Sequence, residues 1–141
     1  MYCMMEACRE VGMTYEALKF YCNEGLVPNV KRDRYNRRVF DDKDINWIKG
    51  LMCLKNCGMS IRDMKDYMTL CFQGKASITD RKAILERKRE ELLQRVAYLQ
   101  EAIAYIDVKQ QFYDDVLSGK QAYVSNLIQV SCQVTHDEIK Y

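Results

Sequence analysis

"VGMTYEALKFYCNEGLVPNVKRDRYNRRVF", residues 11–40, predicts two helices joined by a tight turn and followed by a short hairpin. Gly12 ends a first helix that we expect over residues 5–11. Thr14 is a favourable N-cap for a second helix over residues 15–23, which stops at Gly25. Two brief helices in this arrangement are typical of a helix-turn-helix unit.

The last ten residues of this stretch, 31–40, hold five cations and one anion, although the whole chain has a net charge of only +2. Asn36 tolerates a left-handed backbone, so Tyr35 and Asn36 predict a turn between paired segments 30–32 and 38–40. A basic hairpin directly behind a helix pair indicates a wing that contacts phosphates beside a groove-bound helix. A solvated basic loop is the alternative interpretation.

Asp41 predicts the start of a third helix, over about residues 42–57, as its N-cap. Asp42 and Asp44 then lie in its first turn, where negative charge suits the helix dipole. We therefore interpret these carboxylates as helix-stabilising groups and not as metal ligands.

Ser60 and Asp63 form a capping-box pattern that begins a fourth helix, extending to about residue 70. Met59 and Met64 flank this cap at the spacing of a hydrophobic staple. Gly74 interrupts the helix.

A much longer helix is predicted over residues 77–118, opened by the capping-box pattern Ser77-x-x-Asp80 and ended by Gly119. Its apolar seam alternates steps of four and three residues, as in a coiled coil. The seam reads Leu85, Arg89, Leu92, Val96, Leu99, Ile103, Ile106, Gln110, Tyr113 and Leu117.

The length of this helix predicts a partner. At 1.5 Å per residue it would extend about 60 Å, whereas a compact chain of this size is roughly 40 Å across. We expect a homodimer in preference to a hairpin within one chain. The apolar dimerisation residues would be Leu85, Leu92, Val96, Leu99, Ile103, Ile106, Tyr113 and Leu117.

Composition limits the class of protein. With 141 residues, one proline and six glycines, the chain is expected to be mainly all-α: a small domain with an appendage. The odd number of cysteines, seven, without a CxxC motif or a signal segment, favours a reducing, cytoplasmic location. The sequence contains no run of about 18 apolar residues, so no membrane span is predicted.

An enzyme is not expected, because the chain has one histidine, no glycine-rich phosphate loop and no nucleophile motif. No cofactor is predicted either.

"VGMTYEALKFYCNEGLVPNVKRD" (11–33), "RRVFDDKDINWIKGLMCLKNCGMSIRDMKDYM" (37–68) and the long helix together resemble the MerR family of transcriptional regulators over about residues 3–118. The family's recognition-helix consensus T-L-R-Y-Y-E falls on residues 17–22, with Lys19 in place of arginine. Its wing pattern R-x-x-N-G-Y-R-x-Y is matched by Arg32, Arg38 and Phe40, while residues 35–37 depart from it. Lysine keeps the charge of arginine but lacks its bidentate fork.

This resemblance implies a winged helix-turn-helix domain over residues 1–73, a dimerisation helix over 77–118 and a tail over 119–141. It further implies a homodimer with antiparallel long helices that distorts double-stranded promoter DNA, so that RNA polymerase can use it. We expect the DNA-contacting residues to be Thr14, Tyr15, Glu16, Lys19, Tyr21, Lys31, Arg32, Arg34, Arg37, Arg38 and Ser60.

Cys53 and Cys57 lie one helical turn apart near the end of the third helix. In a branch of the family that this chain resembles, which lacks a ligand-binding domain, a cysteine aligning with Cys53 responds to aldehydes or other thiol-reactive compounds. The alternative is that Cys53 is a small buried hydrophobe. A metal site from Cys71 and Cys132 is a weaker hypothesis, since His136 is the sole histidine.

A second function fits the same pattern: a coiled-coil interaction module whose basic hairpin meets an acidic protein partner. Loss of duplex binding on substitution of Arg37 and Arg38 would distinguish DNA recognition from this alternative.

Overall fold

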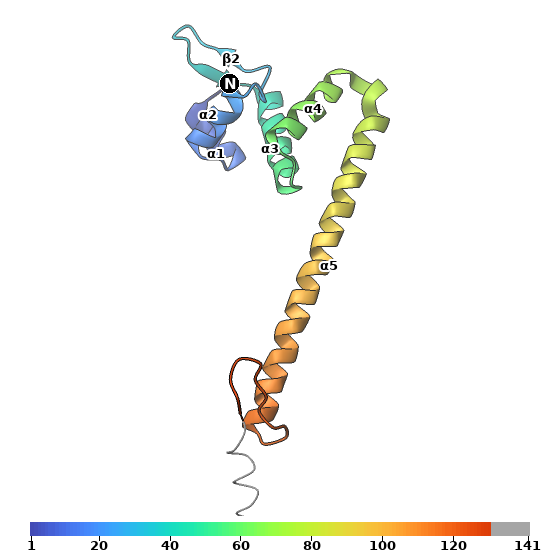
Figure 1. Cartoon of the computed structure of the whole chain (residues 1–141). Coiled ribbons are helices and arrows are strands. Elements are labelled where there is room, and N and C mark those ends of the chain that lie inside the picture. Colours follow the sequence, from blue (N-terminus) through green and yellow to red (C-terminus); the bar gives the residue numbers. More distant parts are fainter. Residues whose placement is uncertain (131–141) are drawn as a thin grey trace, which may run out of the picture. The chain divides into compact units, whose positions relative to one another are not determined.

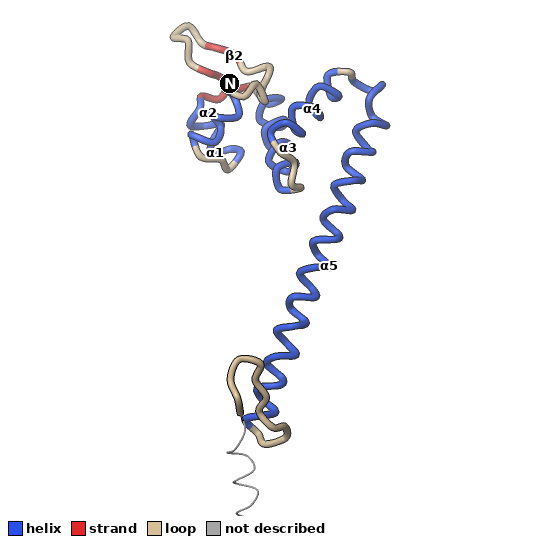
Figure 2. The backbone as a smooth tube through the Cα atoms, in the orientation of Figure 1, coloured by secondary structure: helices blue, strands red, loops and turns tan. Residues whose placement is uncertain are grey.

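The computed structural model of the chain describes residues 1–130 and is mainly helical (Figures 1 and 2). The chain divides after Leu93 into two compact units. The elements are β1 (Tyr2–Cys3), α1 (Met4–Val11), α2 (Tyr15–Asn23), β2 (Lys31–Arg32), β3 (Arg38–Phe40), α3 (Asp42–Asn56), α4 (Ile61–Phe72), the 3₁₀ turn η1 (Gly74–Ser77) and α5 (Ile78–Leu117).

The predicted helix pair is confirmed, including the residues that end α1 and cap α2. Gly12 follows α1 with a φ of 72°, a left-handed backbone that glycine adopts without steric cost. The Thr14 side chain accepts a hydrogen bond from the Ala17 N–H at 3.1 Å and so caps α2. Helix α2 has the bounds that its cap and the following Gly25 predict.

The predicted hairpin is also confirmed, but it belongs to a three-stranded antiparallel sheet in the order β1-β3-β2. Arg32 lies opposite Arg38 in the hairpin, and Asn36 takes the left-handed backbone with a φ of 61°. Strand β1 was not predicted. It places Tyr2 opposite Phe40, and two residues carry too little sequence pattern to indicate a strand.

The core of the first unit lies among α1, α2, α3 and the start of α4 (Figure 1). Helix α3 contributes Ile45, Ile48 and Leu51, and Phe40 closes the core from β3. Met59 and Met64 are both buried, as a hydrophobic staple requires. Truncation of such a buried side chain to alanine typically lowers the free energy of unfolding by about 2–5 kcal/mol, so this core stabilises the first unit.

The corner between α4 and α5 differs from the prediction. Ser77 does not open α5 as an exposed cap: it is 1% exposed, and its Oγ lies within hydrogen-bond distance of the Leu70 and Gly74 carbonyl oxygens. The intervening 3₁₀ turn moves Ser77 under the corner. Arg81 covers it, donating from Nε to Ser77 Oγ at 3.1 Å and from Nη2 to the Gly74 carbonyl at 2.6 Å.

Helix α5 comprises 40 residues, or about 60 Å at 1.5 Å per residue, and ends before Gly119 as predicted. The described residues include the whole of α5, and none of its side chains is buried. Among residues 1–130, the helices all fall short of the length and apolar character that crossing a membrane needs.

Candidate nucleic-acid interface

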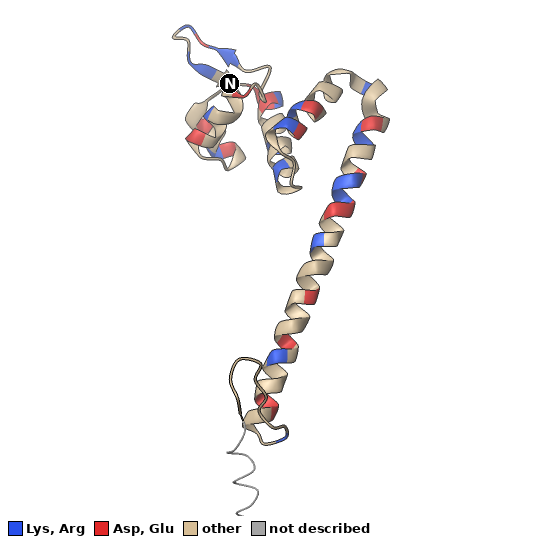
Figure 3. Ribbon diagram, viewed as in Figure 1, with Lys and Arg blue, Asp and Glu red and all other residues tan. Residues whose placement is uncertain are grey.

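The fold brings the start of α2 and the hairpin to one open groove of about 400 Å³. Tyr15 lines it from α2, and Arg32, Arg37 and Arg38 line it from the hairpin. Basic residues stand on both strands of this hairpin (Figure 3). The start of the predicted recognition helix and part of the predicted wing therefore line one groove, whereas the predicted contacts Glu16, Lys19, Lys31 and Arg34 are not among its lining residues.

Asp33 organises the tip of the wing and was not predicted to do so. Its Oδ1 accepts hydrogen bonds from the backbone N–H groups of Tyr35 at 2.8 Å and Arg37 at 2.9 Å. Its Oδ2 lies 3.0 Å from Arg37 Nε. The bond from the Arg37 backbone is the main cause that lowers the pKa of Asp33. The single acidic residue of the wing thus sets the turn, as Asp does through its reach to nearby backbone donors.

The Tyr35 ring makes cation–π contacts with two arginine side chains at the wing tip. The guanidinium of Arg34 lies 4.8 Å from the ring centroid, and that of Arg37 lies 5.0 Å from it. The ring is 63% exposed. Cation–π contacts restrict the two arginine side chains, so charge is presented at the tip with less side-chain freedom to lose on binding.

Two further arginines hold the wing in place. Arg32 donates from Nη1 to the Asn36 carbonyl at 2.9 Å, across the turn. Arg38 donates from Nη2 to Asn23 Oδ1 at 2.6 Å, which joins β3 to the last residue of α2.

Lys31 is paired with acidic groups. Its Nζ lies 2.7 Å from Asp41 Oδ2 and 3.7 Å from Asp44 Oδ2, at the start of α3. The hydrogen bond from Lys31 lowers the pKa of Asp41 to about 2, and the same bond raises the pKa of Lys31. Lys31 therefore anchors the hairpin to α3, and less of its charge is available to a phosphate than that of Arg34.

Among the predicted contacts on α2, Thr14, Tyr15, Glu16 and Lys19 are exposed. Tyr21 is the correction: it is only 4% exposed, and burial raises its pKa. The ring packs in the core because residue 21 lies on the same helix face as Leu18. Phe20, which was not predicted as a contact, is 47% exposed.

Ser60 lies apart from this groove in the structure and caps α4. Its Oγ accepts from the Asp63 N–H at 3.0 Å, and its own N–H donates to Asp63 Oδ2 at 3.3 Å. Lys88 of α5 lies 3.8 Å from the same Asp63 carboxylate. The predicted capping box is confirmed, and the exposed Ser60 leaves the helix N-terminus open to an anion.

The predicted dimerisation seam of α5 is largely exposed in the single chain. Leu99 and Ile103 are each 58% exposed, and Ile106 is 55% exposed. The same holds for Leu85, Val96, Tyr113 and Leu117, whereas Leu92 is half-buried.

The two cysteines near the end of α3 differ in exposure. Cys53 is exposed, and Cys57, whose N–H donates to the Cys53 carbonyl at 3.0 Å, is half-buried. In the single chain, therefore, Cys53 is not a buried hydrophobe. Cys132 and His136, which the weaker metal hypothesis would need, lie outside the described residues.

Residues 2–71 match the MerR HTH family of regulatory proteins. An uncharacterized HTH-type transcriptional regulator of Haemophilus influenzae is 33% identical over 129 residues, which cover 92% of this chain and 96% of that protein. The crystal structure of HiNmlR, a MerR-family regulator lacking the sensor domain and bound to promoter DNA, has a TM-score of 0.69 at 34% identity. That match covers 83% of this chain and 93% of HiNmlR. A putative MerR-family regulator from Listeria monocytogenes has a TM-score of 0.74 at 25% identity, covering 99% of this chain and 98% of the other.

Proposed function

This chain belongs to the MerR family of helix-turn-helix transcriptional regulators, and from this premise we propose that it binds promoter DNA through the groove that Tyr15 and the wing arginines line. The observation that carries the proposal is the groove itself. It places an exposed helix start beside a cationic hairpin, and these are the two parts that a winged helix-turn-helix uses on a duplex.

In this proposal, α2 enters the major groove by its N-terminal turns. Tyr15, Glu16 and Lys19 are exposed there and would reach base edges. Thr14 would contact the backbone beside them, and Ser60 would meet a second phosphate at the start of α4. The domain that does this work corresponds to residues 1–73.

The wing supplies the sequence-independent part of the affinity. Arg34, Arg37 and Arg38 would neutralise phosphates and release counterions, with Lys31 and Arg32 contributing from β2. Asp33 holds Arg37 and Asn23 holds Arg38 in position, and neither Asp33 nor Asn23 need touch the DNA itself.

Two copies would act together. The exposed seam of α5, residues 77–118 in the proposed domain division, supports an antiparallel homodimer that presents two wings to successive grooves. The closing segment, residues 119–141, is assigned as a tail. A dimer that grips two half-sites can bend and untwist the DNA between them, and RNA polymerase would read that distortion.

Cys53 is the proposed sensing residue. Its thiol is exposed on α3, within one turn of Cys57, so an electrophile in solution has access to it. Covalent modification of Cys53 would shift the equilibrium between the protein–DNA complex with distorted DNA and the complex with undistorted DNA.

Titration of a fluorescent duplex from the region upstream of the protein's own gene, at several salt concentrations, tests the proposal. We expect the logarithm of the affinity to fall linearly with the logarithm of the salt concentration. The same length of unrelated duplex is the control for specificity. Salt-independent binding, or unchanged binding after Arg37→Ala and Arg38→Ala together, would count against DNA recognition and in favour of an acidic protein partner.

A further inference from the structure

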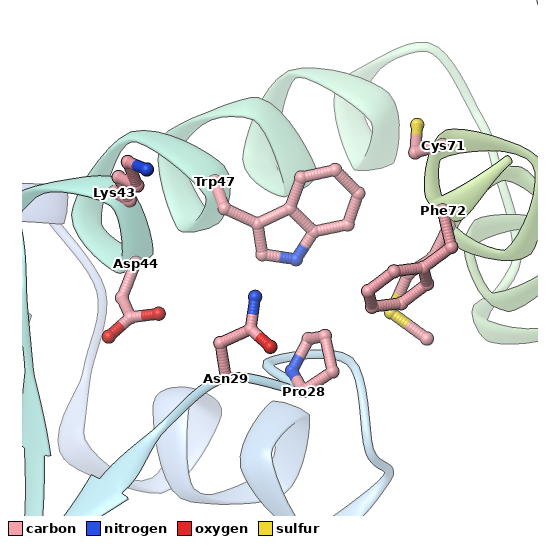
Figure 4. A pocket seen from close by; sticks show the side chains of 8 residues that line it. Pro28, Asn29, Lys43, Asp44, Trp47, Cys71 and Phe72 are labelled. Carbon is pink, nitrogen blue, oxygen red and sulfur yellow. The ribbon is translucent and has the colours of Figure 1, made fainter. Parts of the chain in front are cut away.

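A small cavity opens in the first unit, and its lining residues differ from those of the proposed DNA groove (Figure 4). It has a volume of about 170 Å³ and lies between the loop at Pro28, the start of α3 and the end of α4. Trp47, Met68 and Phe72 supply apolar walls. The Trp47 indole N–H donates a 2.7 Å hydrogen bond to the Leu26 carbonyl, so the position of this wall is fixed before any ligand enters.

A buried carboxylate lies at one end of this cavity and has one oxygen without a hydrogen-bond donor. Asp44 lines the cavity and is only 4% exposed. Its Oδ2 accepts from the Asp41 N–H at 2.9 Å and lies 3.7 Å from Lys31 Nζ. Within residues 1–130, no group donates a hydrogen bond to its Oδ1. Because the described residues hold no sealed side-chain oxygen that lacks a partner, this Oδ1 remains accessible, and the space that Asp44 lines is the cavity. A buried charged oxygen of this kind favours a ligand that donates a hydrogen bond to it.

A cation lies at the same end of the cavity. Lys43 precedes Asp44 in the first turn of α3, and Figure 4 shows both at this end, with Cys71 and Phe72 at the other. Lys43 would repel an ammonium group on a ligand, and Asp44 would repel a carboxylate. A carbonyl group only accepts hydrogen bonds, so it would leave the Asp44 oxygen without a donor. A neutral hydroxyl group both donates and accepts, and it can therefore serve Asp44 and Lys43 together.

We propose that this cavity binds small neutral phenols non-covalently, with the aromatic ring against Trp47 and Phe72 and the hydroxyl group at Asp44. The ligand's O–H would donate to Asp44 Oδ1, and its oxygen would accept from the Lys43 ammonium. A phenolic hydroxyl group stays protonated at neutral pH, so it keeps the donor that Asp44 requires. A ring is favoured over an aliphatic chain, because contacts between aromatic rings add to the burial of apolar area.

The size of the cavity agrees with a single ring. An apolar protein cavity of about 150 Å³ holds benzene, and phenol adds one hydroxyl group to that ring. A volume of about 170 Å³ therefore suits one substituted ring.

Asp44 connects the cavity to the wing, and this consequence rests on the proposed function. The carboxylate that lines the cavity also lies 3.7 Å from Lys31 of β2. A phenol O–H on Oδ1 takes up part of the negative charge of the carboxylate, so Lys31 is held less strongly and is more available to a phosphate. The phenol should therefore raise the affinity for a duplex, and the duplex should raise the affinity for the phenol by the same factor.

Trp47 is the only tryptophan of the chain, so its fluorescence reports on the cavity directly. The full-length protein is titrated with phenol and with toluene, which has the same shape but no hydrogen-bond donor, and Trp47 is excited where neither compound absorbs. We expect phenol to saturate the signal below about 1 mM, which is within reach of a ligand of this size. Phenol should bind at least about threefold more tightly than toluene, although toluene is the more apolar compound, because only phenol can donate to Asp44.

Asp44→Asn tests the carboxylate itself. The asparagine oxygen can still accept from the Asp41 N–H, so the capping box of α3 is kept while the cavity loses its negative charge. This variant should bind phenol about tenfold more weakly than wild type, and toluene with unchanged affinity. Asp42→Asn removes the same charge from an exposed position in the same helix turn, outside the cavity lining, and is the matched control.

Three results would overturn the proposal: a fluorescence change that does not saturate, phenol binding no tighter than that of toluene, or equal phenol affinities in Asp44→Asn and Asp42→Asn. The first two come from the wild-type protein and do not depend on whether a variant folds.

The upstream duplex is then titrated with and without saturating phenol. We expect phenol to raise the duplex affinity of wild type about two- to threefold and to leave that of Asp44→Asn unchanged. An unchanged affinity in wild type would overturn the connection between Asp44 and the wing. If the protein binds no duplex at all, the proposed function fails, while the Trp47 titration still decides the phenol site.

Discussion

Arg38 in the wing and Asn23 at the end of α2 are joined by a hydrogen bond of 2.6 Å between Nη2 and Oδ1. The bond is charge-assisted, and it links two elements that are fifteen residues apart in the chain. It holds the cationic hairpin and the proposed recognition helix at a fixed separation. The two therefore meet a duplex as one surface, without a cost for ordering the wing.

Asn23→Ala should weaken duplex binding about three- to tenfold, which corresponds to the loss of about 1 kcal/mol from a partly exposed hydrogen bond to a charged group. The thermal midpoint should change little, because Asn23 is exposed. Fluorescence anisotropy with the upstream duplex measures the affinity. Asn46→Ala, an exposed asparagine on α3, is the matched control and should bind as wild type. Equal affinities for the two variants would show that the wing is positioned by other contacts.

Arg34→Ala should lower the slope of log affinity against log salt by about 0.9, the value for one phosphate contact. Arg34 stacks on the exposed Tyr35 ring at the wing tip. Lys120→Ala removes one exposed cation outside the matched family region and should leave the slope unchanged. A lower affinity with an unaltered slope would mean that Arg34 supports the wing and does not touch a phosphate.

Local signals in the sequence predicted most helix bounds, because caps and glycines act on their nearest neighbours. Thr14, Asp41 and Ser60 all cap the helices that they were expected to cap. Ser77 did not, since the same residue pattern fits a 3₁₀ corner once Arg81 covers it. The sequence pattern cannot distinguish these two cases without the tertiary contact.

Contacts between distant residues were the part that sequence reasoning missed. Strand β1 forms only because β3 offers it an edge, and Asp33 becomes the centre of the wing only after the chain has turned. Tyr21 was predicted as a DNA contact from its place in the family motif, but its side chain faces the core. Its position three residues after Leu18 on α2 already indicates packing, in agreement with its burial.

Asp41→Asn should make the free energy of unfolding depend less steeply on pH in the acidic range. Because the folded-state pKa of Asp41 is lowered from 3.8 to about 2, its contribution is fully present above pH 3.8. That contribution is lost as the pH falls through about 2, where the carboxylate is protonated and the Lys31 ion pair is broken. Asparagine is also a good N-cap, so the variant keeps the cap of α3. Urea unfolding across this pH range measures the effect, with Asp80→Asn as the exposed control. A profile parallel to wild type would contradict the assigned ion pair.

Leu99→Lys should dissociate the proposed dimer. Leu99 is 58% exposed in the single chain and lies in the middle of the α5 seam, so a buried position in the dimer would receive an unpaired charge. Gln94→Lys adds the same charge on the opposite face of the helix, at a position that the seam does not use, and should remain dimeric. Sedimentation velocity gives the mass of each variant. The duplex titration should show Leu99→Lys binding at least about tenfold more weakly than Gln94→Lys, because a monomer holds one half-site only. If Leu99→Lys sediments as a dimer with full affinity, the two copies are joined by another surface and the antiparallel arrangement of α5 is wrong.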